Sequence, residues 1–349
     1  MNDQAAVPAG TSGKTPLLEV DDLEVAYRIG RGRRAQDLIA VSGVSFHIDH
    51  GETFAVVGES GSGKSTTARA ITRTLPVRAG NIRLGGRELT ELSGRELRRI
   101  RSDVQMVFQD PYSSLNPSML IRDSIAEPLR VHTDLDSHAR DAAAHDLIQA
   151  VGLLPEHLNR YPYEFSGGQR QRIAIARAIA TSPSLVICDE ALSALDVSTQ
   201  NQIIRLLEEI RQTKSVAYLF IAHDLAVVRH IADRVGVMYL GRMMESGPTE
   251  RVYNAPAHPY TEALLSAVPV PHPRRQRARR RMLLPGDVPN PLEPPSGCVF
   301  RTRCPRAMDI CAEEVPMPFP AVGGGEVACH LHTSGPELGG ESVRVLSTA

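Results

Sequence analysis

A glycine-rich stretch, GESGSGKST at residues 58–66, carries the residue types that bind phosphate. It fits the spacing G-x-x-x-x-G-K-[ST] and directly follows an apolar run at residues 54–57. Glycines in such a loop let backbone N–H groups approach phosphate oxygens, and the following helix points its positive end at the same oxygens. A lysine here contacts the β and γ phosphates, and a serine hydroxyl ligates Mg²⁺. The residues predicted to bind a nucleoside triphosphate are Gly58, Glu59, Ser60, Gly61, Ser62, Gly63, Lys64, Ser65 and Thr66.

Polar residues at the ends of apolar strands predict the catalytic half of the site. Residues 185–190 read LVICDE, so Asp189 at the strand tip is expected to hold Mg²⁺ and Glu190 to orient an attacking water. Gln109 and His223 also follow predicted strands, at the sheet edge where ligands bind in open α/β folds. The predicted catalytic residues are thus Lys64, Gln109, Glu190 and His223, and the predicted Mg²⁺ ligands are Ser65, Gln109 and Asp189.

A second turn, SGGQ at residues 166–169, precedes a predicted helix and offers another anion-binding helix N-terminus. The residues concerned are Ser166, Gly167, Gly168 and Gln169. Both turns could fold around one nucleotide, or each could complete a nucleotide held by another subunit.

Alternating strands and helices predict an α/β fold that positions these residues on a parallel sheet covered on both faces. An antiparallel pair at residues 17–27 and 38–48 precedes the phosphate loop, and a helical block at about residues 115–180 is inserted into the sheet. After residue 268 the chain is rich in proline and cysteine, which predicts a separate C-terminal appendage. We expect residues 1–16 to be a mobile tail.

Composition and charge exclude several classes of protein. The 39 basic and 40 acidic side chains balance, no run approaches 18 consecutive apolar residues, and the N-terminal stretch lacks the features of a secretory signal. We therefore expect a cytoplasmic protein without a membrane span. Residues 274–281 contain six arginines but no interleaved aromatic residues to stack on bases, so no nucleic-acid partner is expected.

The ordered motifs resemble those of ATP-binding subunits of ABC transporters, over residues 17–268. GESGSGKST is similar to the family's phosphate loop, FSGGQRQR at residues 165–172 to its signature motif, and SALD at residues 193–196 to its dimer-contact loop. The resemblance implies the P-loop ABC ATPase fold, two domains paired head to tail, and each ATP held between one phosphate loop and the other subunit's signature. It also implies that Tyr27 stacks on adenine and that Asp196 belongs to the nucleotide site. Ala191 and Leu192 depart from the usual Pro and Thr, and neither change removes a catalytic group.

Residues 106–119, 257–269 and 294–311 are similar to the ATPase subunits of oligopeptide/dipeptide importers, a family whose relatives include nickel importers. This resemblance implies that the protein powers peptide import by hydrolysing ATP, while bound to the cytoplasmic face of a membrane. The implied partners are a second, identical or different, ATPase subunit, two membrane permeases and an extracytoplasmic binding protein. Alternative functions are a soluble ABC ATPase acting on ribosomes or nucleic acid, and a nickel or other small-solute importer.

The candidate permease contacts are Tyr112, Leu115 and Met119, with packing inside the helical block as the alternative role of these residues.

Four cysteines, Cys298, Cys304, Cys311 and Cys329, are spaced C-x₅-C-x₆-C-x₁₇-C. A metal centre would stabilise a stretch that buries little apolar surface, and four thiolates suit zinc or an iron–sulfur cluster. The spacing resembles the tail of peptide-importer ATPases, which implies a [4Fe–4S] cluster in a domain at residues 269–335, followed by a flexible tail at 336–349. His330 and His332 leave zinc open, and unmetallated thiols are the third possibility. Cys188 lies inside a predicted strand and is interpreted as a core residue.

Overall fold

The computed structural model describes residues 15–30, 32, 35–110, 112, 114–268, 282 and 284–347. The arginine-rich residues 274–281, and all of the predicted N-terminal tail except Thr15 and Pro16, lie outside the described residues.

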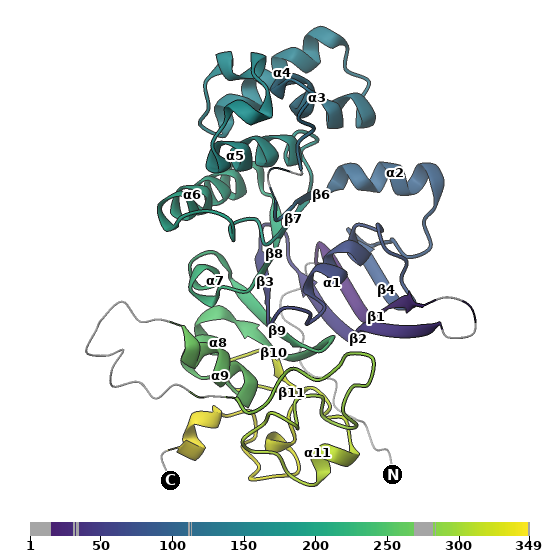
Figure 1. Ribbon diagram of the computed structural model, residues 1–349, viewed down its shortest axis with the longest axis vertical. Coiled ribbons are helices and arrows are strands. Elements are labelled where there is room, and N and C mark those ends of the chain that lie inside the picture. Colours follow the sequence, from purple (N-terminus) through teal and green to yellow (C-terminus); the bar gives the residue numbers. More distant parts are fainter. Residues whose placement is uncertain are drawn as a thin grey trace.

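The described residues form two sheets, the larger of which has eight strands in the order β11-β12-β10-β9-β3-β8-β7-β6 (Figure 1). Its parallel strands are β3 (Thr53–Val57), β6 (Val104–Val107), β7 (Leu185–Asp189), β8 (Ala217–Ala222) and β9 (Arg234–Tyr239), and β10 (Arg242–Pro248) runs antiparallel to β9. Every residue of β3, β7 and β8 is buried, as expected for strands covered on both faces. The predicted parallel sheet is confirmed.

The smaller, antiparallel sheet contains β1 (Leu18–Ile29), β2 (Gln36–Ile48), β4 (Ala79–Leu84) and β5 (Arg87–Glu88), in the order β2-β1-β4-β5. It confirms the predicted antiparallel pair. Apolar side chains of both sheets share one core with helix α1 (Lys64–Ile71), which lies between them (Figure 1). The phosphate loop that starts this helix therefore lies where the two sheets meet.

A helical block separates β6 from β7 along the chain, as predicted. It contains α3 (Ile121–His132), α4 (Ser137–Ala150), two 3₁₀ turns (Pro155–Asn159 and Pro162–Glu164) and α5 (Gly167–Ala178). The sequence did not predict α2 (Gly94–Asp103), because Ile100 is its only buried residue and gives no apolar periodicity. Leu115 is only 2% exposed and packs in the core, so its prediction as a permease contact is wrong, whereas Tyr112 is exposed.

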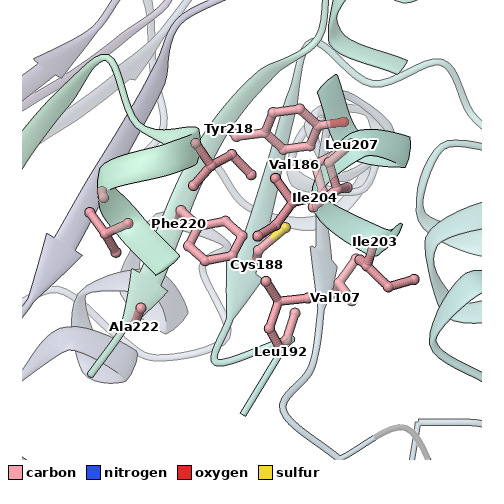
Figure 2. Close-up of a cluster of buried hydrophobic side chains, with 14 of the residues drawn as sticks. Val107, Val186, Cys188, Leu192, Ile203, Ile204, Leu207, Tyr218, Phe220 and Ala222 are labelled. Atoms are coloured by element: carbon pink, nitrogen blue, oxygen red, sulfur yellow. The ribbon is translucent and has the colours of Figure 1, made fainter. Parts of the chain in front are cut away.

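Helices follow the later strands along the chain. Strand β7 is followed by α6 (Val197–Lys214), β8 by α7 (Leu225–Ile231), and the β9–β10 pair by α8 (Thr249–Asn254) and α9 (Pro259–Ala267). Figure 2 shows Cys188 of β7 surrounded by apolar side chains from β8 and α6, including Phe220 and Ile204. Complete burial raises the pKa of the Cys188 thiol to about 12, so it stays protonated. Its interpretation as a core residue is confirmed.

The C-terminal stretch joins the main sheet. It contains α11 (Ile310–Glu313), β11 (Phe319–Pro320), β12 (Glu326–Val327) and two 3₁₀ turns (His330–His332 and Val343–Ser347). Strand β12 pairs with β10, and Phe300 packs its ring against Tyr239 and Tyr260, with centroid separations of 5.3 and 5.2 Å. The expectation of a separate appendage is therefore wrong for residues 298–311, because Cys298, Val299, Phe300 and Cys311 are buried in the same core as the ATPase sheet. The later apolar residues form a second cluster with Ala257, which contains Ala321, Val327, Cys329, Leu331 and Val343.

The end of the chain is also packed over part of the predicted flexible tail. Val343 is fully buried, and its N–H donates a hydrogen bond to the Pro256 carbonyl oxygen at 3.0 Å. The expectation of a free tail is wrong over residues 343–347, since a short segment with one fully buried residue shows no apolar periodicity from which docking could be predicted.

Candidate nucleotide-binding and catalytic site

The phosphate loop follows β3 and forms the floor of a cavity of about 560 Å³. Residues 60–66 line this cavity, as do Tyr27, Gln109 and Glu190. Gly58 and Gly63 have φ angles of 153° and 102°, and a Cβ on either would approach a backbone carbonyl oxygen to 2.1 or 2.5 Å. Only glycine fits these two positions, because the loop packs against the backbone of Met238 on β9 and of Ala40 on β2.

Lys64 is anchored at the centre of the loop. Its Nζ donates hydrogen bonds to the carbonyl oxygens of Gly58 and Glu59, both at 2.8 Å, and to Ser62 Oγ at 3.3 Å. Burial lowers the pKa of Lys64, while the carboxylates of Glu190 and Asp189 act in the opposite direction. The ammonium group is thus held beside the loop, where it can interact with phosphate oxygens.

The two protein oxygens best suited to Mg²⁺ lie side by side. Ser65 Oγ donates a hydrogen bond to Asp189 Oδ1 at 2.7 Å, which joins the start of α1 to the end of β7. Burial raises the pKa of Asp189, and the hydrogen bond from Ser65 partly offsets this effect. A hydroxyl and a carboxylate are hard oxygen donors of the kind that Mg²⁺ prefers, so this pair fits the predicted ion. Bound there, Mg²⁺ would neutralise charge on the nucleotide phosphates.

Glu190 is the meeting point of the other predicted catalytic residues. Gln109 Nε2 donates to Glu190 Oε2 at 2.9 Å, and His223 Nδ1 lies 3.4 Å from the same oxygen. The backbone of Glu190 has a φ of 49°, a conformation that costs a non-glycine residue about 1–3 kcal/mol and that clusters at functional sites. The ends of β6, β7 and β8 therefore bring Gln109, Glu190 and His223 together, and the Glu190 carboxylate can orient a water molecule and accept its proton.

Tyr27 on β1 lines the same cavity, and its hydroxyl lies 3.3 Å from Thr66 Oγ1. Leu38, its register partner on β2, lines the cavity too, followed by Ile39 and Ala40. This end of the cavity is mostly apolar, which suits a nucleobase. Stacking of Tyr27 on adenine stays a prediction.

The second anion-binding turn does not face this cavity. Within the described residues, none of the signature residues 166–169 is among those that line it. Ser166 caps α5: its Oγ accepts from the Gln169 N–H at 3.3 Å, while Gln169 Oε1 accepts from the Ser166 N–H at 3.0 Å. Asp196 likewise caps α6 by accepting from the Thr199 N–H at 3.0 Å. The two turns of one chain therefore do not enclose one nucleotide.

Some residues at the cavity have roles that the sequence did not suggest. Glu59, predicted to bind nucleotide, directs its carboxylate to Arg303 Nη1 at 2.7 Å, and its N–H donates to the Tyr260 hydroxyl at 3.0 Å. The further lining residues that the sequence did not predict are Ser42, Leu240, Gly241, Arg242, Pro291, Pro294, Pro295 and Val299. No sequence signal could have found the last four, since they carry no polar side chain and lie more than 200 positions beyond the loop.

The four C-terminal cysteines share one neighbourhood. The Cys298 N–H donates to the Cys311 carbonyl oxygen at 2.8 Å. Burial raises the pKa of Cys304 to about 11 and also raises that of Cys329, and neighbouring cysteines in the set add to both effects. Yet across the described part of the chain, no group of three or more His, Cys, Asp or Glu side chains is arranged to hold a metal ion. The donor chemistry of the four thiols suits a cluster, but their positions do not form a ready metal site.

The histidines considered as zinc ligands are already engaged. His332 Nε2 lies 2.9 Å from the Ala257 carbonyl oxygen, and its Nδ1 accepts from the Gly340 N–H at 3.1 Å. His330 Nε2 lies 3.0 Å from the Glu314 carbonyl oxygen. Both ring nitrogens of His332 are therefore occupied, and the expectation that it offers a zinc ligand is wrong for this arrangement.

The fold and site together define the class of protein. A phosphate loop, a carboxylate pair at the tip of a buried strand, and a helical block with a capped SGGQ turn make up an ATPase of the ATP-binding cassette class. Residues 41–193 match the family model described as ABC transporter, and residues 244–311 match the C-terminal region of oligopeptide/dipeptide transporters. The chain belongs to the ABC transporter family, as one of its ATP-binding proteins.

Individual relatives are similar along nearly the whole chain. It is 49% identical to the putative oligopeptide transport ATP-binding protein YkfD of Bacillus subtilis, over 91% of this chain and 96% of the relative. It is 50% identical to the oligopeptide transport ATP-binding protein OppF of Escherichia coli, over 88% and 94%. One similar solved structure is the dimeric post-hydrolysis state of the ATP-binding cassette MJ0796 bound to ADP and Pi. Its TM-score is 0.60 at 26% sequence identity, and the match covers 66% of this chain and 98% of that chain.

Proposed function

We propose that this chain is the ATP-hydrolysing subunit that powers import of oligopeptides or dipeptides through an ABC membrane transporter. The observation that carries the proposal is the match of residues 244–311 to the oligopeptide/dipeptide transporter C-terminal region, in a chain that also has a cavity lined by a phosphate loop, Gln109 and Glu190. Relatives about 50% identical are named oligopeptide transport ATP-binding proteins. No family match or named relative described above supports the alternatives of a nucleic-acid-acting ATPase or a nickel importer.

In this proposal, Lys64 and the loop amides bind the phosphates, Ser65 and Asp189 hold Mg²⁺ with Gln109, and Glu190 orients the water. His223 contacts Glu190 from the next strand end and would stabilise its position. Because the signature residues 166–169 lie outside the cavity, a second ATPase subunit would supply the signature that completes it. Hydrolysis would then depend on closure of the two subunits, which is the step available to drive transport.

The chain would attach to its membrane through partners. No helix within the described ranges is both long and apolar enough to cross a bilayer. We infer that the protein lies on the cytoplasmic face, bound to two permeases, with an extracytoplasmic protein delivering the peptide. The exposed Tyr112, over whose ring the Arg170 guanidinium lies at 3.9 Å, and the half-buried Met119 are our candidate permease contacts.

The experiment that tests the function is reconstitution of the co-purified complex in proteoliposomes. We expect ATP hydrolysis to rise when the binding protein is loaded with peptide. We also expect peptide to accumulate on the side of the membrane that carries the ATPase subunits, and only when ATP is present. Stimulation by a nickel-loaded binding protein in place of a peptide-loaded one would contradict the peptide assignment, and co-purification with ribosomes instead of permeases would contradict the transport assignment.

We also propose a [4Fe–4S] cluster on Cys298, Cys304, Cys311 and Cys329, rather than zinc or free thiols. It is supported by the sulfur-only donor set of four thiols that influence one another. Because the four side chains do not form a ready metal site among the described residues, binding of the cluster would have to rearrange them. Protein purified without oxygen should be brown and contain about four irons per chain, and Cys304→Ser should lose both properties. Cys188→Ser, in the core of the ATPase sheet, is the matched control and should keep the iron. Colourless protein with one zinc, or with no metal, would overturn this assignment.

A further inference from the structure

Four residues of the C-terminal stretch form part of the wall of the nucleotide cavity. Pro291, Pro294, Pro295 and Val299 line the same cavity as Tyr27 and the phosphate loop. We call residues 291–299 the proline wall. It belongs to the stretch that the sequence suggested was a separate appendage, yet it lies at the site where the ATPase binds its substrate.

The chemistry of the wall points to the part of the nucleotide that it would contact. The four lining side chains carry no hydrogen-bond donor, acceptor or charge, so they offer triphosphate oxygens nothing. Their apolar surface suits the faces of a base and the carbons of a ribose, as in most small-molecule sites. Phosphate chemistry is instead concentrated on the loop at residues 60–66.

The wall also borders the strand pair that carries Tyr27. Val299, Ser42 of β2 and Arg242 of β10 line an adjoining hollow as well as the main cavity. The Ser42 N–H donates to the Gly241 carbonyl oxygen at 2.8 Å, which fixes the turn between β9 and β10 against β2. The wall therefore shares its surroundings with β2 and the β9–β10 turn, which line the same cavity as Tyr27.

The wall is anchored at its C-terminal end, whereas Pro291 and Pro294 are exposed and Pro295 is half-buried. Its prolines fix their own φ angles and restrict the residues before them. Ser296 Oγ donates to the Ala312 carbonyl oxygen at 2.8 Å, and Arg301 Nε donates to the Ser296 carbonyl oxygen at 2.9 Å. Val299 and Phe300 are buried in the main core. A proline-rich segment anchored at one end loses less conformational entropy than a free segment when a ligand packs against it.

From these observations we propose that the proline wall is a base- and ribose-binding surface of the ATP site, acting together with Tyr27. The inference rests on the nucleotide site described above and adds the C-terminal stretch to it. The wall contributes to affinity for the nucleoside part of ATP and contributes nothing to affinity for the triphosphate part.

A two-ligand binding experiment separates these contributions. The full chain is titrated with ATP and with inorganic tripolyphosphate, both in EDTA so that hydrolysis is blocked. The double substitution Pro294→Ala/Pro295→Ala removes two rings from the wall, and we expect the Kd for ATP to rise about three- to tenfold while that for tripolyphosphate is unchanged. Pro336→Ala is the matched control, because Pro336 is exposed in the same stretch and does not line the cavity.

If the double variant does not fold, Pro291→Ala replaces it, since Pro291 is exposed and its loss costs little packing; about a twofold rise in the Kd for ATP is then expected. Unchanged ATP affinity in a folded variant would overturn the proposal, and so would equal weakening of both ligands, because the wall would then act through the loop. If the unmodified chain bound neither ligand, the nucleotide site itself would fail, and this inference with it.

Discussion

Replacing Glu190 with glutamine tests the centre of the site most directly. Glu190 Oε2 accepts a hydrogen bond from Gln109 Nε2 at 2.9 Å and lies 3.4 Å from His223 Nδ1. Glutamine keeps the length and one acceptor oxygen, so the Gln109 contact can persist, but it cannot accept a proton. A positioned general base contributes about 10²–10⁴ in rate, equivalent to about 3–5 kcal/mol of activation free energy. We expect hydrolysis to fall by that factor and ATP binding to be retained.

The assay measures phosphate release by the purified transporter complex and, separately, the equilibrium affinity for ATP. Glu209→Gln makes the same chemical change at an exposed position on α6 and should leave both quantities unchanged. Near-normal hydrolysis by Glu190→Gln would refute the assignment of the general base. Loss of ATP binding together with hydrolysis would also refute it, since the residue would then hold the nucleotide and not the water.

Two further predictions concern the nucleotide and the second subunit. Lys64→Ala removes the ammonium group that now bonds Gly58, Glu59 and Ser62, and should weaken ATP binding at least tenfold in the same titration, whereas Lys214→Ala at the exposed end of α6 should not. The isolated chain should be a poor ATPase whose specific activity rises with protein concentration or on addition of its partner ATPase. Full activity that is independent of concentration would show that one chain completes its own site.

Much of the site could be predicted because its motifs are local. The motifs GESGSGKST and LVICDE each lie where a buried strand meets a polar turn. A short stretch of sequence therefore shows both which residues could act and that they lie at the end of a strand. The meeting of Gln109, Glu190 and His223 follows from topology, since parallel strands bring their C-terminal ends to one edge of the sheet. The apolar runs at residues 185–188, 217–221 and 235–239 predict three strands, and their limits differ by one residue from those observed for β7, β8 and β9.

The features that could not be predicted depend on contacts between distant parts of the chain. Strand β12 has two residues, too few to show an alternating pattern, yet it attaches the C-terminal stretch to the ATPase sheet. The left-handed backbone of Glu190 is imposed by its surroundings and not by its residue type. Arg303 pairs with a residue 244 positions earlier, and an arginine followed by a cysteine gives no hint of that partner.

The pairing of Arg303 with Glu59 explains how the C-terminal stretch and the phosphate loop form one structural unit. Burial tends to lower the pKa of Arg303, but its hydrogen bonds to Glu59 and Tyr239 outweigh burial and raise it, so the guanidinium stays charged. Only 10% of the Arg303 side chain and 27% of the Glu59 side chain are exposed, so solvent screens this pair less than a surface ion pair. Removing one partner would leave a charge in a partly buried position, which is destabilising. The Arg303 N–H also donates to the Phe300 carbonyl oxygen at 3.0 Å, so the arginine that reaches the phosphate loop belongs to a hydrogen-bonded turn just before Cys304.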